Sequence, residues 1–152
     1  MEIIDLENDN KSKVLDLNSN YYYENKESIF KTRREYIKRR RKNEPLFRLE
    51  GALRCRTYSA FKNKKWDKKS STYTLLNASP ELLKSHIERQ FSEGMTWENY
   101  GKDGWEADHI IPLSSATTEC ELKNLFKYTN IQPLWRSDNR SKGSKLNWSK
   151  PK

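Results

Sequence analysis

The chain has 152 residues, enough for one compact domain with extensions, and its 34% hydrophobic and 34% charged residues predict a modest core. Its formal net charge of +9 at pH 7 favours a polyanionic partner, and nucleic acid is the polyanion that we expect. No run approaches the roughly 20 apolar residues that span a bilayer, and the first residues are acidic, so we expect neither a membrane partner nor a secretory signal.

Residues 1–20 form an acidic segment with five Asp and Glu against two Lys, accompanied by scattered Ile, Leu and Val. We interpret this segment as a flexible N-terminal arm, because chain termini are poorly ordered unless packing holds them. A short strand followed by a loop is the alternative interpretation.

Residues 21–71 are strongly basic, and we expect this region to bind DNA. Between residues 26 and 69 the sequence has 17 Lys and Arg against five Asp and Glu. Charge runs are often only solvated faces, but an excess of one sign repels itself unless a polyanion neutralises it. We therefore expect this region to contact the phosphate backbone of double-stranded DNA.

Two helices are predicted in the basic region, at Glu24–Lys42 and Leu46–Lys62. The first has no Gly or Pro and carries apolar residues at helical spacing, and Pro45 separates it from the second. Arginines lie beside the apolar positions of both helices. The arginines that we assign to DNA binding are Arg33, Arg34, Arg39, Arg40, Arg41, Arg54 and Arg56.

A third helix is marked by its first residues. Ser79 is placed to cap the helix, Pro80 occupies its first position, and Gly94 provides a C-terminal stop. Within this helix His86 lies beside an apolar stripe, and we interpret it as a structural residue rather than a catalytic one.

Cysteine usage is sparse. The two cysteines, Cys55 and Cys120, are far apart and form no C-x-x-C pair, so we expect neither a structural zinc site nor a disulfide framework. We interpret both as small apolar residues that fill space in helical segments.

Two short strands are predicted towards the C-terminus, at Trp105–Ile111 and Ile131–Leu134. Both contain or adjoin a proline that cannot donate to a sheet. We therefore expect Pro112 and Pro133 at a strand end, a sheet edge or a bulge.

Helices are predicted between and after these strands. The segment Thr117–Phe126 reads as a short helix in which Thr118 and Glu121 form a capping box. A final helix is expected to follow Ser137 as its cap and to end at Gly143. The predicted order of elements is strand, helix, strand, helix.

Four polar residues mark this C-terminal region. Asp108 and His109 stand side by side in the first strand, and the sequence has only two histidines. Asn130 directly precedes the second strand. Asn139 lies nine residues after Asn130, in the last helix. These motifs, in this order, resemble the HNH endonucleases, the ββα-metal nuclease family, and in particular its phage-type members. The similarity covers about Ser79–Lys145.

The resemblance implies a fold and an activity. The expected fold is α+β and mostly helical, with a C-terminal ββα-metal core at residues 104–145 inside a nuclease domain at residues 72–152. The expected activity is metal-dependent hydrolysis of DNA phosphodiester bonds in the cytoplasm of a bacterial or phage-infected cell.

The resemblance also implies roles for the four polar residues. The position of His109 is that of the general base, Asp108 and Asn139 are the ligands of a single Mg²⁺, and Asn130 braces the loop. Oxygen ligands favour a hard ion, with Mn²⁺ as a substitute. Adjacent strand residues point to opposite faces, so we expect His109 to face the attacking water and Asp108 the metal.

Further cations follow the second strand, and we expect them to contact phosphates: Arg136, Arg140, Lys142 and Lys145. Two alternatives to a DNA endonuclease stay open. One is a DNA-binding accessory protein with a vestigial nuclease site. The other is an HNH nuclease that acts on RNA or on branched DNA.

Overall fold

The computed structural model describes residues 2–101 and 104–149, with side chains described from residue 18 onward. The chain divides into two compact units, Met1–Asn43 and Glu44–Lys152. This division differs from the sequence analysis, which placed boundaries after residues 20 and 71. The difference arises because the boundary between the units lies inside the basic region. This boundary is next to Pro45, the only proline of that region.

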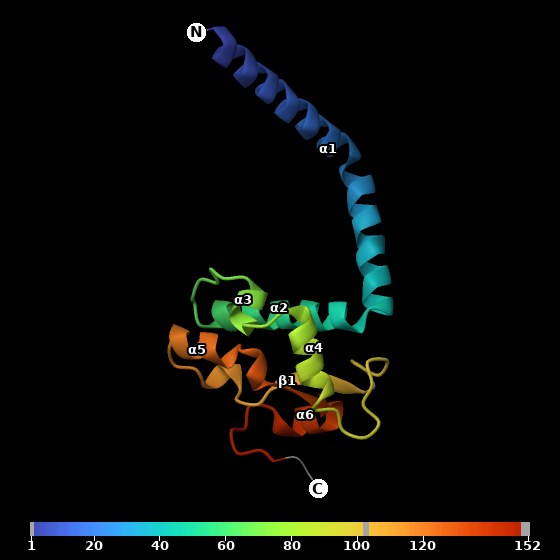
Figure 1. The fold of residues 1–152 in the computed structure, drawn as a ribbon, viewed down its shortest axis with the longest axis vertical. Coiled ribbons are helices and arrows are strands. Elements are labelled where there is room, and N and C mark those ends of the chain that lie inside the picture. Colours follow the sequence, from blue (N-terminus) through green and yellow to red (C-terminus); the bar gives the residue numbers. More distant parts are fainter. Residues whose placement is uncertain (1, 102–103, 150–152) are drawn as a thin grey trace. The chain divides into compact units, whose positions relative to one another are not determined.

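The first unit is the helix α1 (Glu2–Asn43), drawn in blue to cyan in Figure 1. Residues 2–20 belong to this helix rather than to the alternative strand and loop, and the stretch has no helix-breaking Gly or Pro. The predicted helix at residues 24–42 is thus the second part of a longer one. It ends where Glu44 takes extended backbone (φ −121°, ψ 93°), as expected for a residue before proline.

The second unit begins with two helices. Helix α2 (Pro45–Asn63) has Pro45 at its start and matches the prediction within one residue at each end. Helix α3 (Thr72–Leu76) was not predicted, because five residues are too few for a periodic pattern. The Oγ of Ser71 caps it by accepting a hydrogen bond from the backbone N–H of Thr74 at 3.1 Å.

Helix α4 (Pro80–Glu88) starts as predicted, with Ser79 Oγ accepting from the backbone N–H of Leu82 at 3.2 Å. It ends earlier than the predicted stop at Gly94, which instead takes φ +79° in a later turn. The side chain of Gln90 donates to the carbonyl of His86 at 3.0 Å, and a continued helix would use this carbonyl itself.

The sheet consists of two antiparallel strands, β1 (Trp105–His109) and β2 (Ile131–Trp135). In its register Asp108 lies opposite Gln132, and His109 lies opposite Ile131. Both strands are edges, which explains how β2 accommodates a proline at its centre. Taken over its described residues, the chain is therefore α+β and mostly helical, as the sequence predicted.

The elements that connect and follow the strands are short. Two 3-10 turns, Leu113–Ser115 and Tyr128–Asn130, flank helix α5 (Glu119–Leu125). Both hydrogen bonds of the predicted capping box of α5 are present. Helix α6 (Arg136–Lys142) follows β2 directly, so it has no side-chain cap, and the predicted cap Ser137 lies inside the helix. Its end at Gly143, where φ is +52°, is as predicted.

Hydrogen bonds alternate along β1 between its two edges. The carbonyl of Gly104 accepts from Arg136, and the N–H of Ile110 donates to Asn130, so the even-numbered residues between them pair with β2. The odd-numbered residues, among them Ala107 opposite Pro133, turn their backbone groups to the outer edge. The proline therefore removes no bond from the ladder, and the carbonyls of Ala107 and His109 are open to side chains.

The core of the second unit places β1 against the helices. Trp105 is fully buried and contacts the rings of Phe91, Trp97 and Tyr100. Further buried side chains from α2, α4 and β2 complete this cluster: Leu49, Leu53, Leu83, Ile87 and Ile131. Within the described ranges no helix is both long and apolar enough to cross a membrane.

Candidate active site

Asp108 and His109 lie on opposite faces of β1. Burial alternates along the strand, with Trp105, Ala107 and His109 on the core side and Glu106 and Asp108 on the other side. Helix α6 lies over that second side, as its contacts with both carboxylates show. The strand period thus separates the imidazole from the carboxylate, as the sequence predicted.

His109 is buried, with 5% of its surface exposed, and its ring packs edge-on against Phe126 at 5.8 Å between centroids. No described residue hydrogen-bonds to its Nε2 atom. Burial first, and then the nearby charge of Arg56, lower the pKa of His109 from 6.5 to about 4. Asp108 opposes this shift. The ring is therefore neutral at pH 7, and one of its nitrogens can accept a proton.

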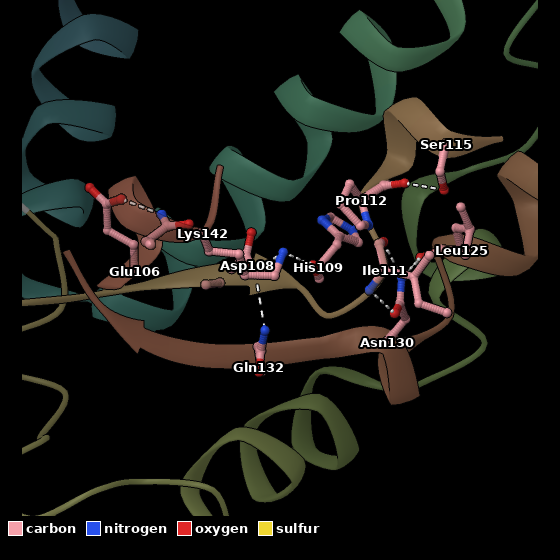
Figure 2. A network of polar contacts seen from close by, with 12 residues as sticks. Glu106, Asp108, His109, Ile111, Pro112, Ser115, Leu125, Asn130, Gln132 and Lys142 are labelled. Atoms are coloured by element: carbon pink, nitrogen blue, oxygen red, sulfur yellow. Dashed lines mark hydrogen bonds and ion pairs between the residues drawn. The ribbon is translucent and has the colours of Figure 1, made fainter. Parts of the chain in front are cut away.

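The Asp108 carboxylate pairs with a cation from α6. Its Oδ2 atom lies 2.9 Å from Nζ of Lys142 and accepts a hydrogen bond from Nε2 of Gln132 at 3.2 Å. Figure 2 shows Asp108 between these two partners on β1. The other carboxylate oxygen, Oδ1, receives no hydrogen bond from the described residues.

Lys142 was predicted to contact phosphate, but the structure buries its side chain. Its side chain is only 3% exposed, and its ammonium also donates to the carbonyl oxygen of His109 at 2.8 Å. Lys142 is buried because it lies on the side of α6 that faces the strand. There its ammonium reaches the His109 carbonyl, which β2 leaves unpaired at the outer edge of β1. Lys142 therefore contacts the predicted site from within and presents no charge to an external phosphate.

Glu106 belongs to the site although the sequence analysis did not select it. Its Oε2 accepts a hydrogen bond from Nδ2 of Asn139 at 2.7 Å, and its Oε1 lies 3.5 Å from Nε of Arg136. Its position two residues before Asp108 was the available signal, because residues at that spacing share a strand face. The structure therefore brings Asn139 to the carboxylate face of β1.

Asn130 joins the loop after β1 to the end of α5. Its Oδ1 accepts from the backbone N–H of Ile111 at 2.9 Å. Its Nδ2 donates to the carbonyls of Ile111 and Leu125 at 3.0 and 2.8 Å. These contacts, shown in Figure 2, fix the conformation of the loop that follows His109.

Arg56 reaches the site from α2. Its Nη1 donates to the carbonyl oxygen of Ala107 at the outer edge of β1. The sequence analysis grouped Arg56 with Arg54 as a DNA contact, but their surroundings differ, because Arg54 is exposed and Arg56 is half-buried beside the strand. Arg56 thus places a fixed positive charge near His109.

The other cations assigned to DNA lie mostly at the surface. On α1, Arg40 is half-buried and the others are exposed: Arg33, Arg34, Arg39 and Arg41. After β2, Arg140 and Lys145 are exposed, whereas Arg136 is half-buried against Glu106.

His86 and the two cysteines lie outside the site. The Nε2 of His86 is 2.9 Å from the carbonyl oxygen of Ile131, and its ring packs against Tyr128, in keeping with the structural role expected for it. Cys55 and Cys120 are free and exposed. Their interpretation as buried filler was wrong, because both lie on the outward faces of their helices.

The residues around Asp108 suit a hard divalent ion. Two oxygens, Oδ1 of Asp108 and Oδ1 of Asn139, accept no hydrogen bond within the described part of the chain, and carboxylate and amide oxygens are ligands that Mg²⁺ uses. The described residues contain no cluster of three His, Cys, Asp or Glu side chains that could hold a metal.

Comparison with known proteins yields relatives without an assigned function. No protein-family model matches the chain, and no solved structure matches it significantly. The uncharacterized protein L426 of Acanthamoeba polyphaga mimivirus is 36% identical over 102 residues, which are 66% of this chain and 44% of that protein. The uncharacterized protein L246 of the same virus is 30% identical over 117 residues, 76% of this chain and 50% of that protein. The chain spans about half the length of these curated relatives.

Proposed function

We propose that this chain is a metal-dependent endonuclease of the HNH type that hydrolyses DNA phosphodiester bonds. One observation carries the proposal: the buried His109 ring has an Nε2 atom without a partner among the described residues, and the opposite face of the same strand carries Asp108 and meets Asn139. An unpaired buried ring nitrogen is costly to stability, and such groups are frequent where a site needs a proton acceptor.

The order of elements supports a ββα-metal core. Strand β1 carries Asp108 and His109, Asn130 precedes β2, and α6 brings Asn139 back to β1. The hydrogen bonds of Asn130 fit the bracing role implied by the resemblance, because they tie the loop after His109 to α5.

His109 would act as the general base. The neutral ring takes a proton from a water molecule as the water oxygen attacks the phosphorus, and the bond to the departing 3′-oxygen breaks. Burial and the neighbouring Arg56 keep the ring neutral at pH 7. Asn130 holds the adjacent loop, which limits the orientations available to the ring.

The carboxylate face would hold Mg²⁺ through Asp108 and Asn139, with Mn²⁺ as a substitute. When bound, such an ion neutralises charge on the phosphate and stabilises the departing oxygen. Gln132 orients the Asp108 carboxylate from the neighbouring strand, and Glu106 orients the Asn139 amide. Such supporting contacts are usual around metal ligands.

Double-stranded DNA is the proposed substrate because exposed cations occur in both units. All but one of the arginines assigned on α1 are exposed, Arg40 being half-buried, and the exposed Arg140 and Lys145 lie near the end of α6. A cavity of about 440 Å³ between α2 and the 3-10 turn after β1 is lined in part by two further cations, Arg56 and Lys64. Cations of this kind bind the phosphate backbone without selecting a sequence.

The test is incubation of purified protein with supercoiled plasmid in Mg²⁺ or in EDTA. Nicked or linear product in Mg²⁺, and none in EDTA, supports the proposal. Replacing His109 with Ala should slow cleavage at least about 10²-fold with little change in DNA binding, because that is the usual contribution of a general base. His86→Ala is the matched control and should keep cleavage.

Two outcomes identify the alternatives. Binding of DNA without cleavage under any metal condition would favour an accessory protein with a vestigial site. Cleavage of RNA or of four-way junctions in preference to plasmid would keep the chemistry and change the substrate.

A further inference from the structure

Lys142 is a buried lysine inside the candidate active site. It lies one helical turn after Asn139 on α6, and its ammonium contacts Asp108 Oδ2 at 2.9 Å and the His109 carbonyl oxygen at 2.8 Å. The exposed fraction is 3% for the Lys142 side chain and 15% for that of Asp108. A buried ammonium needs such partners, because its transfer out of water is otherwise strongly unfavourable.

The ammonium contacts Asp108 Oδ2, and only Oδ1 of the same carboxylate is left for a metal ion. The ammonium already neutralises the carboxylate that the proposed function assigns to the metal. A divalent ion on the same carboxylate would lie within a few ångströms of Nζ, where water screens the repulsion between the two cations weakly. Asp108 therefore binds a divalent ion less tightly while the ammonium stays at Oδ2.

The surroundings allow the ammonium to leave Asp108. It has three donors and can keep the carbonyl of His109, which lies at the outer edge of β1. Lys142 also lines a cavity of about 240 Å³ together with Gln90 and Gln132, whose side chains offer polar atoms. A small movement of a flexible side chain is enough to separate Nζ from Oδ2.

We propose that Lys142 is a positioning residue that fills the cation position at Asp108 and is displaced from it when a divalent ion binds. The inference rests on the proposed function in one respect, namely that Asp108 is a metal ligand. In the metal-free protein the Lys142 ammonium orients the Asp108 carboxylate and neutralises its charge. The affinity for metal is then set by competition between the ion and this ammonium.

The experiment measures Mn²⁺ binding directly, by the electron paramagnetic resonance signal of free Mn²⁺, in the absence of DNA. Lys142→Met keeps an unbranched side chain that is one atom shorter and removes the charge. We expect it to bind Mn²⁺ about tenfold more tightly than the parent protein, which is the scale on which residues around metal ligands change affinity. The exposed Lys145→Met is the matched control, with the same change in net charge and an unchanged affinity.

Equal or weaker binding of Mn²⁺ by a folded Lys142→Met protein would overturn the proposal, because a purely structural ion pair predicts no gain. Lys142→Arg keeps the charge and should stay near the parent affinity. Asp108→Asn combined with Lys142→Met should abolish the gain, and retention of the gain would place the ion elsewhere.

A second measurement covers the case in which Lys142→Met does not fold. In the parent protein, Mg²⁺ titration should shift the side-chain ¹³Cε resonance of Lys142 and leave that of Lys145 in place. An unchanged Lys142 resonance at saturating Mg²⁺ would equally overturn the proposal.

The failure of this inference is distinguishable from failure of the proposed function. Plasmid cleavage by the parent protein without a gain in Mn²⁺ affinity for Lys142→Met contradicts only the role of Lys142. Tighter Mn²⁺ binding by Lys142→Met, with no cleavage by the parent protein, contradicts only the nuclease.

Discussion

Arg56 on α2 donates a hydrogen bond to the carbonyl oxygen of Ala107 on β1, two residues before His109. The contact connects the basic helix to the outer edge of the strand that carries the candidate base. It also places a guanidinium close enough to lower the pKa of His109, second only to burial as a cause. Arg56 of α2 and the candidate base are therefore electrostatically coupled.

Replacing Arg56 with Met should raise the pKa of His109 from its value of about 4, because a nearby positive charge disfavours protonation of the ring. NMR titration of the His109 ring resonances measures this change. Arg54→Met removes an exposed charge from the same helix and should leave the titration unaltered. A pKa that stays the same in Arg56→Met would show that the Arg56 charge does not act on the ring.

The pH dependence of cleavage follows from the same pKa. His109 must be neutral to accept a proton, so kcat/KM should be insensitive to its titration from pH 8 to pH 5 and should fall as pH drops through about 4. Initial rates on plasmid at constant free Mg²⁺ measure this profile. A midpoint near pH 6.5 would contradict the buried ring as the general base.

The stability of the fold should depend on pH through His109. The pKa of His109 is lowered from 6.5 to about 4 in the folded protein, so below pH 6.5 the unfolded chain binds more protons. The free energy of unfolding should therefore decrease between pH 6.5 and 4, by up to about 3 kcal/mol from this residue. Urea unfolding of the parent and of His109→Leu gives the comparison. The variant should lack this part of the decrease, and identical profiles would contradict the shift.

Replacing Asn130 with Ala should slow cleavage while leaving Mn²⁺ affinity nearly unchanged. The substitution removes three hydrogen bonds to Ile111 and Leu125, and with them the connection between the loop after His109 and α5. The free energy of unfolding should fall by about 1–3 kcal/mol, because three hydrogen bonds are lost together. Asn124→Ala, at an exposed position on α5, is the control for both measurements. Full activity of a destabilised Asn130→Ala protein would assign Asn130 to folding alone.

Replacing Arg39, Arg40 and Arg41 with Gln should reduce the salt dependence of DNA binding. Each arginine that neutralises a phosphate releases about one counterion, so the slope of log K against log salt should become shallower by up to roughly three. Binding isotherms on a duplex at several salt concentrations give this slope. If the slope does not change, the end of α1 does not contact phosphate.

The sequence by itself predicted the local structure around the candidate site. Ser79 and Thr118 mark helix starts because their hydroxyls accept from the N–H groups of the first turn. Pro45 marks a break because the residue before proline avoids the helical region. The opposite directions of Asp108 and His109 follow from the strand period, which depends on the backbone alone.

Only the tertiary structure decided which side chains meet across elements. Lys142 and Lys145 look alike in the sequence, yet Lys142 is buried against Asp108 and Lys145 is exposed. Arg56 and Arg54 differ in the same way, and Glu106 meets Asn139 only because α6 folds back on β1. Periodicity assigns a residue to a face, but the element that packs on that face determines its partner, its burial and its charge environment.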